Sequence, residues 1–543
     1  MGKLSIGHLV RRSVAAVTAV GLLALAACDA PPPTGPAIEP GNPGAADVQL
    51  AVDAYLDTRY ISRAIYGSNV ARDMPSNKLT MLRLGGNRWT GYNWETNASN
   101  AGSDWCYQND AFLSGSATPG EAVRPAVQTA KDNGASIIVT VPIVDHVAAD
   151  KLGGSGPPEC SGDIRKSANY QTTRLEANVA DKPGALSLVP STSDDTVYQE
   201  EFVNWLRQAV PGTDVWFSLD NEPDLWADTH PQLHAGKVGY AELVERSIRY
   251  SRAIKGVWPE AKVTGPASYG FYGFERLQDA PDAAGRNFLD FYLQQMAAAQ
   301  TTYGTRLLDH LDLHWYPEAR GGGVRISGGD NSAAVAAARV QAPRSLWDPT
   351  YVEDSWITTD YGYGPIRLIP RTQDRIAANY PGTGLTFSEW NYGGGNHISG
   401  AIAVADVLGI MGRERVDAAT YWELLGDESY AYAAFRAFRN YDGAGSAFLP
   451  VSVRATTSDV GTATVYASTS NEQTVIIAIN KATTPKTAGI TVRSPNRYTK
   501  ADVWTLTSAG PSLQPGPQLT ETATNAFRTT LPAMSVSVIV PKP

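Results

Sequence analysis

The chain has 543 residues, and 45 Lys and Arg residues against 54 Asp and Glu residues give it a formal net charge of −9. This length exceeds what one hydrophobic core usually serves, so it predicts more than one domain. The acidic balance, with no basic run beyond Arg11-Arg12, argues against a nucleic-acid-binding protein and suits an uncharged polymer better.

Residues 1–28 have the parts of an export signal in their usual order. Basic residues, Lys3, Arg11 and Arg12, precede an apolar run at 14–24, which is shorter than the roughly 20 residues that a membrane-spanning helix needs. The signal ends in Leu25-Ala26-Ala27-Cys28, which resembles a bacterial lipobox, whose cysteine becomes a lipidated N-terminus. We therefore expect a lipid anchor on Cys28 to be the contact of this protein with a membrane.

The segment after this cysteine, residues 29–46, is rich in Pro, Gly and Ala, as a flexible tether would be. This order predicts an exported lipoprotein of the cell envelope, at the outer membrane or the cell surface, and we expect a monomer. The alternative is an ordinary signal peptide on a secreted protein, in which Cys28 has no special role.

Cys106 and Cys160 are the other two cysteines of the chain. An oxidising compartment permits them to pair, and no Cys-x-x-Cys spacing indicates a metal site. We expect one disulfide between them, with two separate buried thiols as the alternative.

Residues 61–442 contain eight apolar, β-branched or aromatic runs that end in polar residues or glycine. Helical patterns, such as 119–133 and 240–256, separate several of these runs. Strands that alternate with helices predict an α/β fold, a (β/α)8 barrel, with long insertions at 90–118, 150–198 and 318–375. The predicted strands are 64–67, 81–86, 137–142, 215–219, 262–266, 311–316, 385–389 and 419–424.

Beyond residue 443 the pattern changes to short alternating runs that Ser, Thr, Asn, Gly and Pro separate. This pattern predicts an antiparallel β-sandwich domain at 443–543. We expect the sandwich to support the barrel, with carbohydrate binding as the alternative role. The predicted strands are 451–454, 463–467, 474–479, 489–492, 501–506 and 536–540.

Two of the predicted barrel strands end in a glutamate. One is followed by Asp220-Asn221-Glu222-Pro223, where Pro223 ends the strand because it has no N–H to donate. The other is followed by Glu389-Trp390-Asn391-Tyr392 and then by three glycines, which let a ligand approach the backbone closely. Barrel enzymes place their chemistry at these strand ends. Glycoside hydrolysis needs two such carboxyl groups, one protonated and one ionised, so Glu222 and Glu389 are the predicted catalytic pair.

Three stretches resemble segments of glycoside hydrolase family 44, and the similarity extends over most of residues 60–540. The stretch Phe217 to Trp226, with Thr229-His230-Pro231 behind it, resembles the acid/base segment of this family. The stretch Phe387 to Gly394 resembles its nucleophile segment, which usually reads Thr-Glu-Tyr-Asn-Tyr-Gly-Gly, so Ser388 and Trp390 depart from it. His314-Trp315-Tyr316-Pro317 is similar to a third segment.

The resemblance implies a retaining endo-β-1,4-glucanase that acts on cellulose derivatives, xyloglucan or related glycans by double displacement. It assigns Glu222 as the acid/base and Glu389 as the nucleophile, and it implies that residues 47–60 join the sandwich. No cofactor is expected for the chemistry, although a structural calcium ion is known from the family.

Further residues near these strand ends have predicted roles. Asn221 is expected to bond the sugar 2-hydroxyl, Tyr316 to donate a hydrogen bond to Glu389, and His314 to contact the substrate. Asp220 and Asp312 are expected to be buried supports. The aromatic residues predicted to stack on sugar rings are Trp226, Trp315, Trp390, Tyr392 and Trp422.

Three alternatives compete with this interpretation. Glu423 also follows an apolar run and is a rival acid, although its side chain points away from Trp422 if both lie on one strand. His310 and His314 are four residues apart, which leaves a metal-dependent barrel hydrolase open, but neither His-x-His nor His-Glu-x-x-His occurs. The third is a surface glycan-binding lipoprotein without activity.

Overall fold

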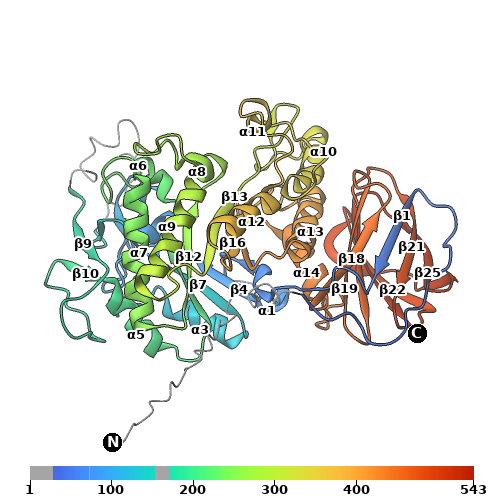
Figure 1. Ribbon diagram of the computed structural model, residues 1–543, viewed down its shortest axis with the longest axis horizontal. Helices are drawn as coiled ribbons and strands as arrows, with labels where there is room; N and C mark the ends of the chain where they lie inside the picture. The colour runs from blue at the N-terminus through green and yellow to red at the C-terminus, as the bar shows by residue number, and fades with distance from the viewer. Residues whose placement is uncertain (1–28, 72–73, 153–169, 171) are drawn as a thin grey trace, which may run out of the picture.

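The computed structural model describes residues 29–71, 74–152, 170 and 172–543. A barrel and a sheet-rich domain lie side by side in it (Figure 1). The predicted export signal with Cys28, and Cys160, lie outside the described residues. No described helix is long and apolar enough to cross a membrane.

Eight parallel strands close into the barrel, which confirms the predicted α/β fold. Around the barrel the order is β11, β12, β13, β16, β17, β3, β4 and β7. The strands are β3 (Gly67–Ser68), β4 (Met81–Leu84), β7 (Ser136–Val141), β11 (Val215–Leu219), β12 (Lys262–Ser268), β13 (His310–Trp315), β16 (Gly384–Trp390) and β17 (Ala418–Tyr421).

The first predicted strand is partly wrong. Residues Arg63–Ile65 form a 3-10 helix, η1, and the strand begins only at Gly67. The Ser62 side chain accepts a hydrogen bond from the Ala64 N–H at 3.2 Å, and this cap starts a helical turn where the apolar pattern predicted a strand.

Helices pack around the barrel (Figure 1). The two helical patterns found in the sequence correspond to α3 (Arg124–Asp132) and α7 (Tyr240–Val257). The others of eight or more residues are α5 (Gln199–Ala209), α9 (Phe288–Tyr303), α10 (Ala333–Gln341), α12 (Leu368–Asn379), α13 (Ile398–Arg413) and α14 (Ser429–Arg439). Short helices that shape the mouth of the barrel are α2 (Asn87–Thr90), η5 (Pro223–Leu225), α6 (Trp226–Thr229) and α8 (Phe271–Arg276).

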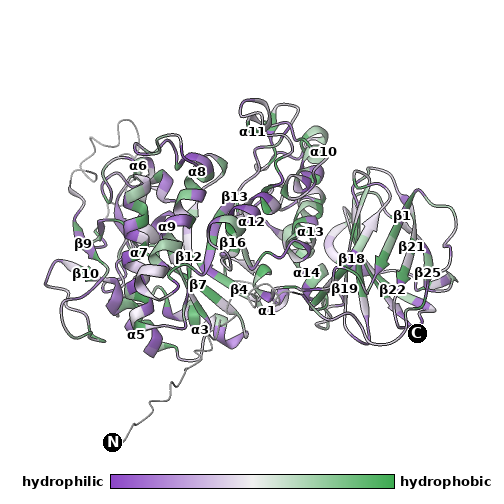
Figure 2. Ribbon diagram, in the orientation of Figure 1, coloured by the Kyte–Doolittle hydropathy of each residue, from purple (hydrophilic) through white to green (hydrophobic). Residues whose placement is uncertain are grey.

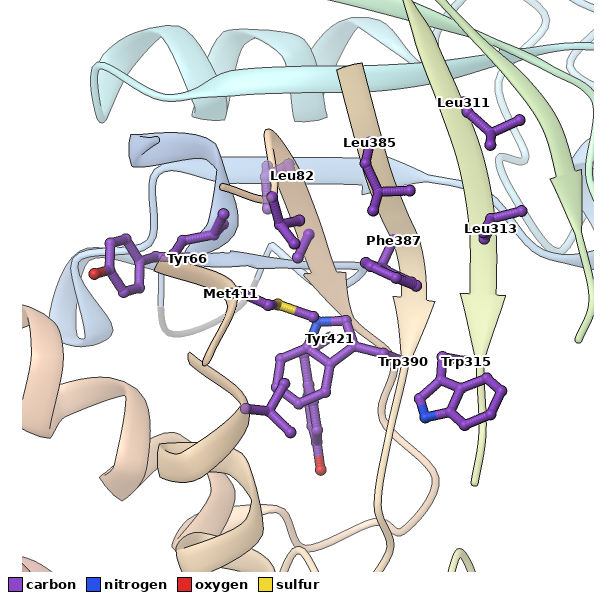
Figure 3. Close-up of a cluster of buried hydrophobic side chains, with 14 of the residues drawn as sticks. Tyr66, Leu82, Leu311, Leu313, Trp315, Leu385, Phe387, Trp390, Met411 and Tyr421 are labelled. Atoms are coloured by element: carbon purple, nitrogen blue, oxygen red, sulfur yellow. The ribbon is translucent and has the colours of Figure 1, made fainter. Parts of the chain in front are cut away.

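Side chains alternate between the two faces of the barrel strands. Leu82, Leu311, Leu313, Leu385 and Phe387 belong to the large apolar cluster that includes the surrounding helices (Figure 3). The intervening residues face the barrel interior, because successive side chains of a strand point to opposite faces. Many of these interior residues are polar and buried, among them Arg83, Thr140, Ser218, Thr264, Asp312, Ser388 and Thr420. The barrel therefore has an apolar outer layer and a polar interior near its mouth.

The sheet-rich domain has two layers joined at their edges. One layer runs through β2, β18, β19, β20, β26, β22 and β23, and the other through β1, β21, β25 and β24. A separate apolar cluster, with Leu50, Ile476 and Ile490 among its members, fills the space between them, and Figure 2 shows apolar residues along these strands. The strands are β1 (Val48–Asp53), β2 (Arg59–Tyr60), β18 (Val451–Thr457), β19 (Ala463–Thr469), β20 (Thr474–Asn480), β21 (Lys486–Arg493), β22 (Lys500–Thr507), β23 (Gly510–Pro515), β24 (Leu519–Ala523), β25 (Ala526–Leu531) and β26 (Ser535–Lys542).

Two features of this domain differ from the sequence prediction. Strands β23, β24 and β25 lie where no strand was predicted. No residue of β23 or β24 is fully buried, so these two strands lack the apolar alternation that marks a strand. The domain is also not purely antiparallel, because β1 pairs with β21 in parallel.

The segment before β1 lies against the sheet-rich domain instead of standing free as a tether. Ile38 pairs with Ser494, and the Gly41 N–H donates to the Thr524 carbonyl at 2.7 Å. Cys106 is buried and is engaged in a disulfide. Its predicted partner, Cys160, is not among the described residues, and that pairing stays a prediction.

A buried ion pair joins the barrel to the sheet-rich domain. Asp406 of α13 accepts hydrogen bonds from Thr464 at 2.7 Å and Tyr466 at 2.6 Å, both on β19. Its other oxygen lies 2.6 Å from the Lys481 ammonium group, and neither side chain is exposed by more than 1%. Removing one partner of such a buried pair destabilises the fold, because no water reaches the remaining charge to take the place of the lost partner.

Replacing Asp406 with Asn tests this junction. The amide keeps an acceptor for Thr464 and Tyr466 but leaves the Lys481 charge unpaired, so we expect the free energy of unfolding to fall by about 3–5 kcal/mol. Denaturant unfolding measures the change. In the double variant Asp406→Asn/Lys481→Met, most of the loss should be recovered, and an unchanged stability of Asp406→Asn would show that the pair does not hold the domains together.

Candidate active site

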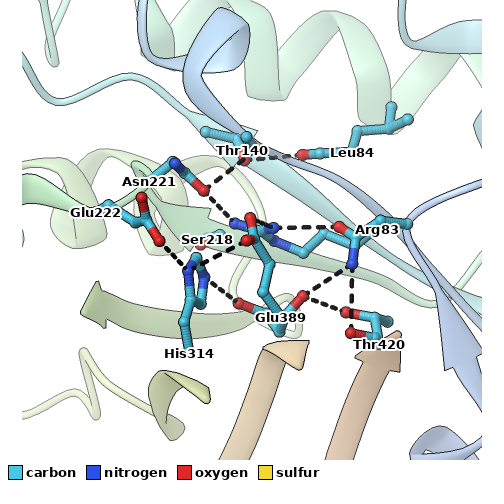
Figure 4. A network of polar contacts seen from close by, with 12 residues as sticks. Arg83, Leu84, Thr140, Ser218, Asn221, Glu222, His314, Glu389 and Thr420 are labelled. Carbon is cyan, nitrogen blue, oxygen red and sulfur yellow. Dashed lines mark hydrogen bonds and ion pairs between the residues drawn. The ribbon is translucent and has the colours of Figure 1, made fainter. Parts of the chain in front are cut away.

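Glu389, at the end of β16, is held from two sides. The Arg83 guanidinium on β4 lies 2.7 Å from its Oε1 (Figure 4), and the Tyr316 hydroxyl donates to its Oε2 at 2.7 Å. The same guanidinium donates to the Asn221 side-chain oxygen at 2.7 Å. Arg83 therefore connects the end of β16 to the end of β11, and the bond expected from Tyr316 is present.

Glu222 follows β11 and faces Glu389 across His314. One oxygen of Glu222 lies 2.8 Å from His314 Nδ1, and Glu389 Oε2 lies 3.5 Å from the same nitrogen. Figure 4 shows the imidazole between the two carboxylates. The other ring nitrogen lies 3.1 Å from the Ser388 hydroxyl, which fixes the ring orientation.

The surroundings move the pKa values of the two glutamates in opposite directions. Burial raises the pKa of Glu222 above its ordinary value, although the neighbouring His314 opposes this. Burial acts the same way on Glu389, but the charges of His314 and Arg83 and the Tyr316 hydrogen bond outweigh it and hold its pKa below the ordinary value. The pKa of His314 is raised, because the two carboxylates outweigh the effect of burial. The site thus favours a proton on Glu222 and a negative charge on Glu389.

The two carboxylates are close enough to act on one small group. One oxygen of Glu222, one oxygen of Glu389 and a nitrogen of His314 all lie within 4.8 Å of one another. The same three groups have the spacing of cation ligands, but the guanidinium of Arg83 already pairs with Glu389 and repels a cation there.

Other acids lie near Glu95, away from this site. Glu95 is buried, and burial together with the charges of Asp194, Glu176 and Glu201 raises its pKa to about 8. Among the described residues, only Glu222, His314 and Glu389 form a group with ligand atoms within 4.8 Å of one another, so the acids near Glu95 do not make up a cation site and the structural calcium ion stays an expectation.

Asp220 and Asp312 are buried supports, as expected. Asp220 accepts hydrogen bonds from Thr90 at 2.7 Å, from the Ile143 N–H at 2.6 Å and from the Asn221 N–H at 2.8 Å. Asp312 accepts from the Ser388 N–H and from Thr264, each at 3.1 Å. Asp220 therefore joins the segments after β11 and β7 to α2, and Asp312 joins β13 to β12 and β16.

Most of the predicted stacking residues are buried, which corrects that prediction. Trp226, Trp390 and Tyr392 have no exposed surface and Trp315 is only 2% exposed, so no ring face is open to a sugar. Trp422 is partly exposed, and its ring packs on Gly86, whose N–H donates to Asn221. Only Trp422 of the five retains the position of a stacking residue.

The glycine loop after Tyr392 also serves packing. A Cβ at Gly393 would lie 2.3 Å from the Ile326 carbonyl oxygen, and one at Gly394 would lie 2.4 Å from the Arg339 guanidinium. Protein backbone and a buried arginine therefore approach these glycines closely. The sequence predicted that a ligand would do so.

The rival residues have contacts of their own with other groups. Glu423 accepts a hydrogen bond from Tyr432 of α14 at 2.8 Å. His310 stacks on Trp216 with ring centroids 4.5 Å apart, and burial lowers its pKa to about 4. His314 is grouped with Glu222 and Glu389 instead, so the His310–His314 metal pair does not form.

Sequence reasoning missed Arg83 and Asn69. Arg83 is fully buried and also donates to the Asn69 side-chain oxygen at 3.1 Å, while the Asn69 amide donates to the Ser388 carbonyl at 3.0 Å. An arginine inside the apolar run Met81-Leu82-Arg83-Leu84 was the available signal, because an unpaired charge is almost never buried.

Comparison with known proteins connects this site to a family. A model described as glycoside hydrolase family 44 matches residues 98–319. Endoglucanase A of Paenibacillus lautus is 42% identical over 525 residues, which cover 92% of this chain and 73% of that protein.

Solved structures agree. A Paenibacillus polymyxa xyloglucanase from family 44, determined with xyloglucan, has a TM-score of 0.85 at 37% identity. A family 44 endoglucanase from Clostridium thermocellum has a TM-score of 0.84 at 39% identity. Each comparison covers 91% of this chain and 99% of the other.

Replacing Arg83 with Gln tests the charge balance at Glu389. A carboxylate that must be ionised loses activity as the pH falls through its pKa, and removal of the neighbouring positive charge raises that pKa. We expect the acid limb of kcat/KM to move to higher pH by about 1–3 units. Tyr316→Phe removes a hydrogen bond and no charge, so its shift should have the same sign and be smaller. An acid limb that stays in place in Arg83→Gln would contradict this account.

Proposed function

This chain belongs to glycoside hydrolase family 44, and we propose that it cleaves β-1,4-glucan backbones internally with retention of configuration. The observation that carries this proposal is the close approach of Glu222 and Glu389, with oxygens within 4.8 Å. Retaining enzymes have their carboxyl groups about 5–5.5 Å apart, whereas inverting enzymes need about 6.5–9.5 Å to admit a water molecule.

In the first step, Glu222 donates its proton to the glycosidic oxygen as the bond to the anomeric carbon breaks. Glu389 attacks the opposite side of that carbon and forms a glycosyl ester. The raised pKa of Glu222 keeps the proton available, and the lowered pKa of Glu389 keeps the nucleophile ionised. Arg83 and Tyr316 hold the attacking carboxylate in place.

In the second step, Glu222, now ionised, takes a proton from a water molecule. That water attacks the anomeric carbon and releases Glu389, so two displacements restore the β configuration. Asn221, which Arg83 and the Gly86 N–H hold by its side-chain oxygen, keeps its amide N–H groups for the sugar 2-hydroxyl.

Azide separates the roles of the two glutamates. In Glu222→Ala, a substrate whose leaving group needs no proton still forms the glycosyl-enzyme, so azide should restore turnover and give a β-glycosyl azide. In Glu389→Ala no ester forms. Azide can then attack the anomeric carbon only from the side that Glu389 occupied, opposite the leaving group, and it gives the α-glycosyl azide. Proton NMR distinguishes the products, and an α-anomer as the first product of the native enzyme would overturn the retaining assignment.

The relatives indicate the substrate class. Paenibacillus lautus endoglucanase A and the Paenibacillus polymyxa xyloglucanase share most of their length with this chain. The first is named an endoglucanase and the second a xyloglucanase. We propose for this chain the β-1,4-glucan backbone of cellulose derivatives and xyloglucan.

Activity on soluble polysaccharides tests the substrate. We expect carboxymethylcellulose and xyloglucan to lose viscosity early, while few reducing ends have formed, because internal cuts shorten a chain most. A β-1,3-glucan of similar size serves as the control and should remain intact. Release of a single small sugar from the outset, with little change in viscosity, would argue against internal cleavage.

A further inference from the structure

Glu222 lies in an uncommon backbone conformation. Its φ of 46° and ψ of 56° are left-handed, a region that residues other than glycine rarely adopt. Its N–H donates to the Ala267 carbonyl at 3.0 Å, and Ala267 itself has a φ of 55°. Conformations of this kind persist only where the surrounding contacts enforce them.

Asp224 supplies such contacts two residues after Glu222. Its carboxylate is buried and accepts hydrogen bonds from the Ser268 hydroxyl at 2.5 Å and from the Tyr269 N–H at 3.1 Å. Ser268 and Tyr269 directly follow Ala267, so this carboxylate ties the chain after β11 to the chain after β12. Together with the bond from Glu222 to Ala267, it fixes the backbone of the proposed acid. We call these contacts, of Glu222 with Ala267 and of Asp224 with Ser268 and Tyr269, the clamp.

Helix α8 covers this clamp. A Cβ at Gly273 would lie 1.9 Å from Asp224 Oδ2 and 2.5 Å from the Ser268 hydroxyl oxygen. Only a residue without a side chain allows the helix to pack directly on the Asp224–Ser268 pair. The clamp is therefore enclosed on its outer side and does not exchange its hydrogen bonds freely with water.

We propose that Asp224 is a positioning residue that holds Glu222 in the orientation needed to protonate the leaving oxygen. This inference rests on the acid role of Glu222 given under the proposed function. Asp224 acts through the backbone, since its hydrogen bonds go to Ser268 and Tyr269. Loosening the clamp moves the Glu222 carboxyl group, and a shift of about 1 Å costs roughly 10²-fold in rate.

Two substitutions weaken the clamp and change the size of the substituted side chain little. In Asp224→Asn the amide oxygen can take the place of Oδ2, which accepts both bonds, but it carries no negative charge, so the hydrogen bonds from Ser268 and Tyr269 weaken. In Ser268→Ala the carboxylate stays and loses only the hydroxyl donor. The two variants therefore test one clamp from both of its sides.

The readout is the dependence of kcat/KM on the leaving group. A cello-oligosaccharide needs protonation of its leaving oxygen, whereas a dinitrophenyl cello-oligosaccharide does not, and kcat/KM reports only steps up to glycosyl-enzyme formation. We expect Asp224→Asn to lose about 10-fold or more on the first substrate and little on the second. Ser268→Ala should show the same selective loss, of smaller size.

Glu353→Gln is the matched control. Glu353 is also buried and accepts from a serine hydroxyl, that of Ser345, at 2.5 Å, but it lies in the insertion between β13 and β16. It should lower the thermal midpoint without changing the ratio of the two kcat/KM values.

Three outcomes separate the possibilities. Equal losses on both substrates in Asp224→Asn and Ser268→Ala would overturn the positioning role and leave a structural one. If Asp224→Asn does not fold, the ratio measured for Ser268→Ala decides. Glu222→Gln is included as the reference, and if it shows no leaving-group dependence, the acid role itself fails, which is distinct from failure of the clamp.

Discussion

Glu389 is almost completely buried, yet its pKa lies below the ordinary value because His314, a buried guanidinium and a phenol hydroxyl contact its carboxylate. Removing a carboxylate from water is expensive unless charges and hydrogen bonds replace the water. Arg83, Tyr316 and His314 provide that replacement; Arg83 comes from β4, and His314 and Tyr316 come from the end of β13. The closed barrel is what holds these groups within reach of one carboxylate.

The alternation of side chains along the strands makes this interior possible. Outward residues such as Leu313 and Phe387 pack against helices, so the interior positions are free to be polar. Those polar residues are paired across neighbouring strands, as Asp312 is with Ser388 and Thr264. The core therefore stabilises the barrel from outside, while hydrogen bonds align the strand ends that carry the chemistry.

The two glutamates differ because their neighbours differ. For Glu222, the contact with His314 is the main effect that lowers the pKa, and it is smaller than the effect of burial. Burial therefore raises the pKa and favours the protonated form. Glu389 faces the charges of His314 and Arg83, which outweigh the same burial. The site thus favours an acid and an anion side by side, which is what the proposed double displacement requires.

The sequence by itself determined the eight-stranded barrel, the second sheet-rich domain and the two strand-end glutamates, because periodicity and residue type are local properties. It also indicated that Tyr316 donates to Glu389. Only the tertiary structure decided that Arg83 joins Glu389 to Asn221, because residues 83, 221 and 389 meet through barrel closure. The tertiary structure also decided burial. The sequence predicted that several aromatic residues stack on sugar rings, yet neighbouring elements cover Trp226, Trp315, Trp390 and Tyr392. Local pattern reveals which residues are aromatic, whereas packing between distant segments decides which of their faces remain open.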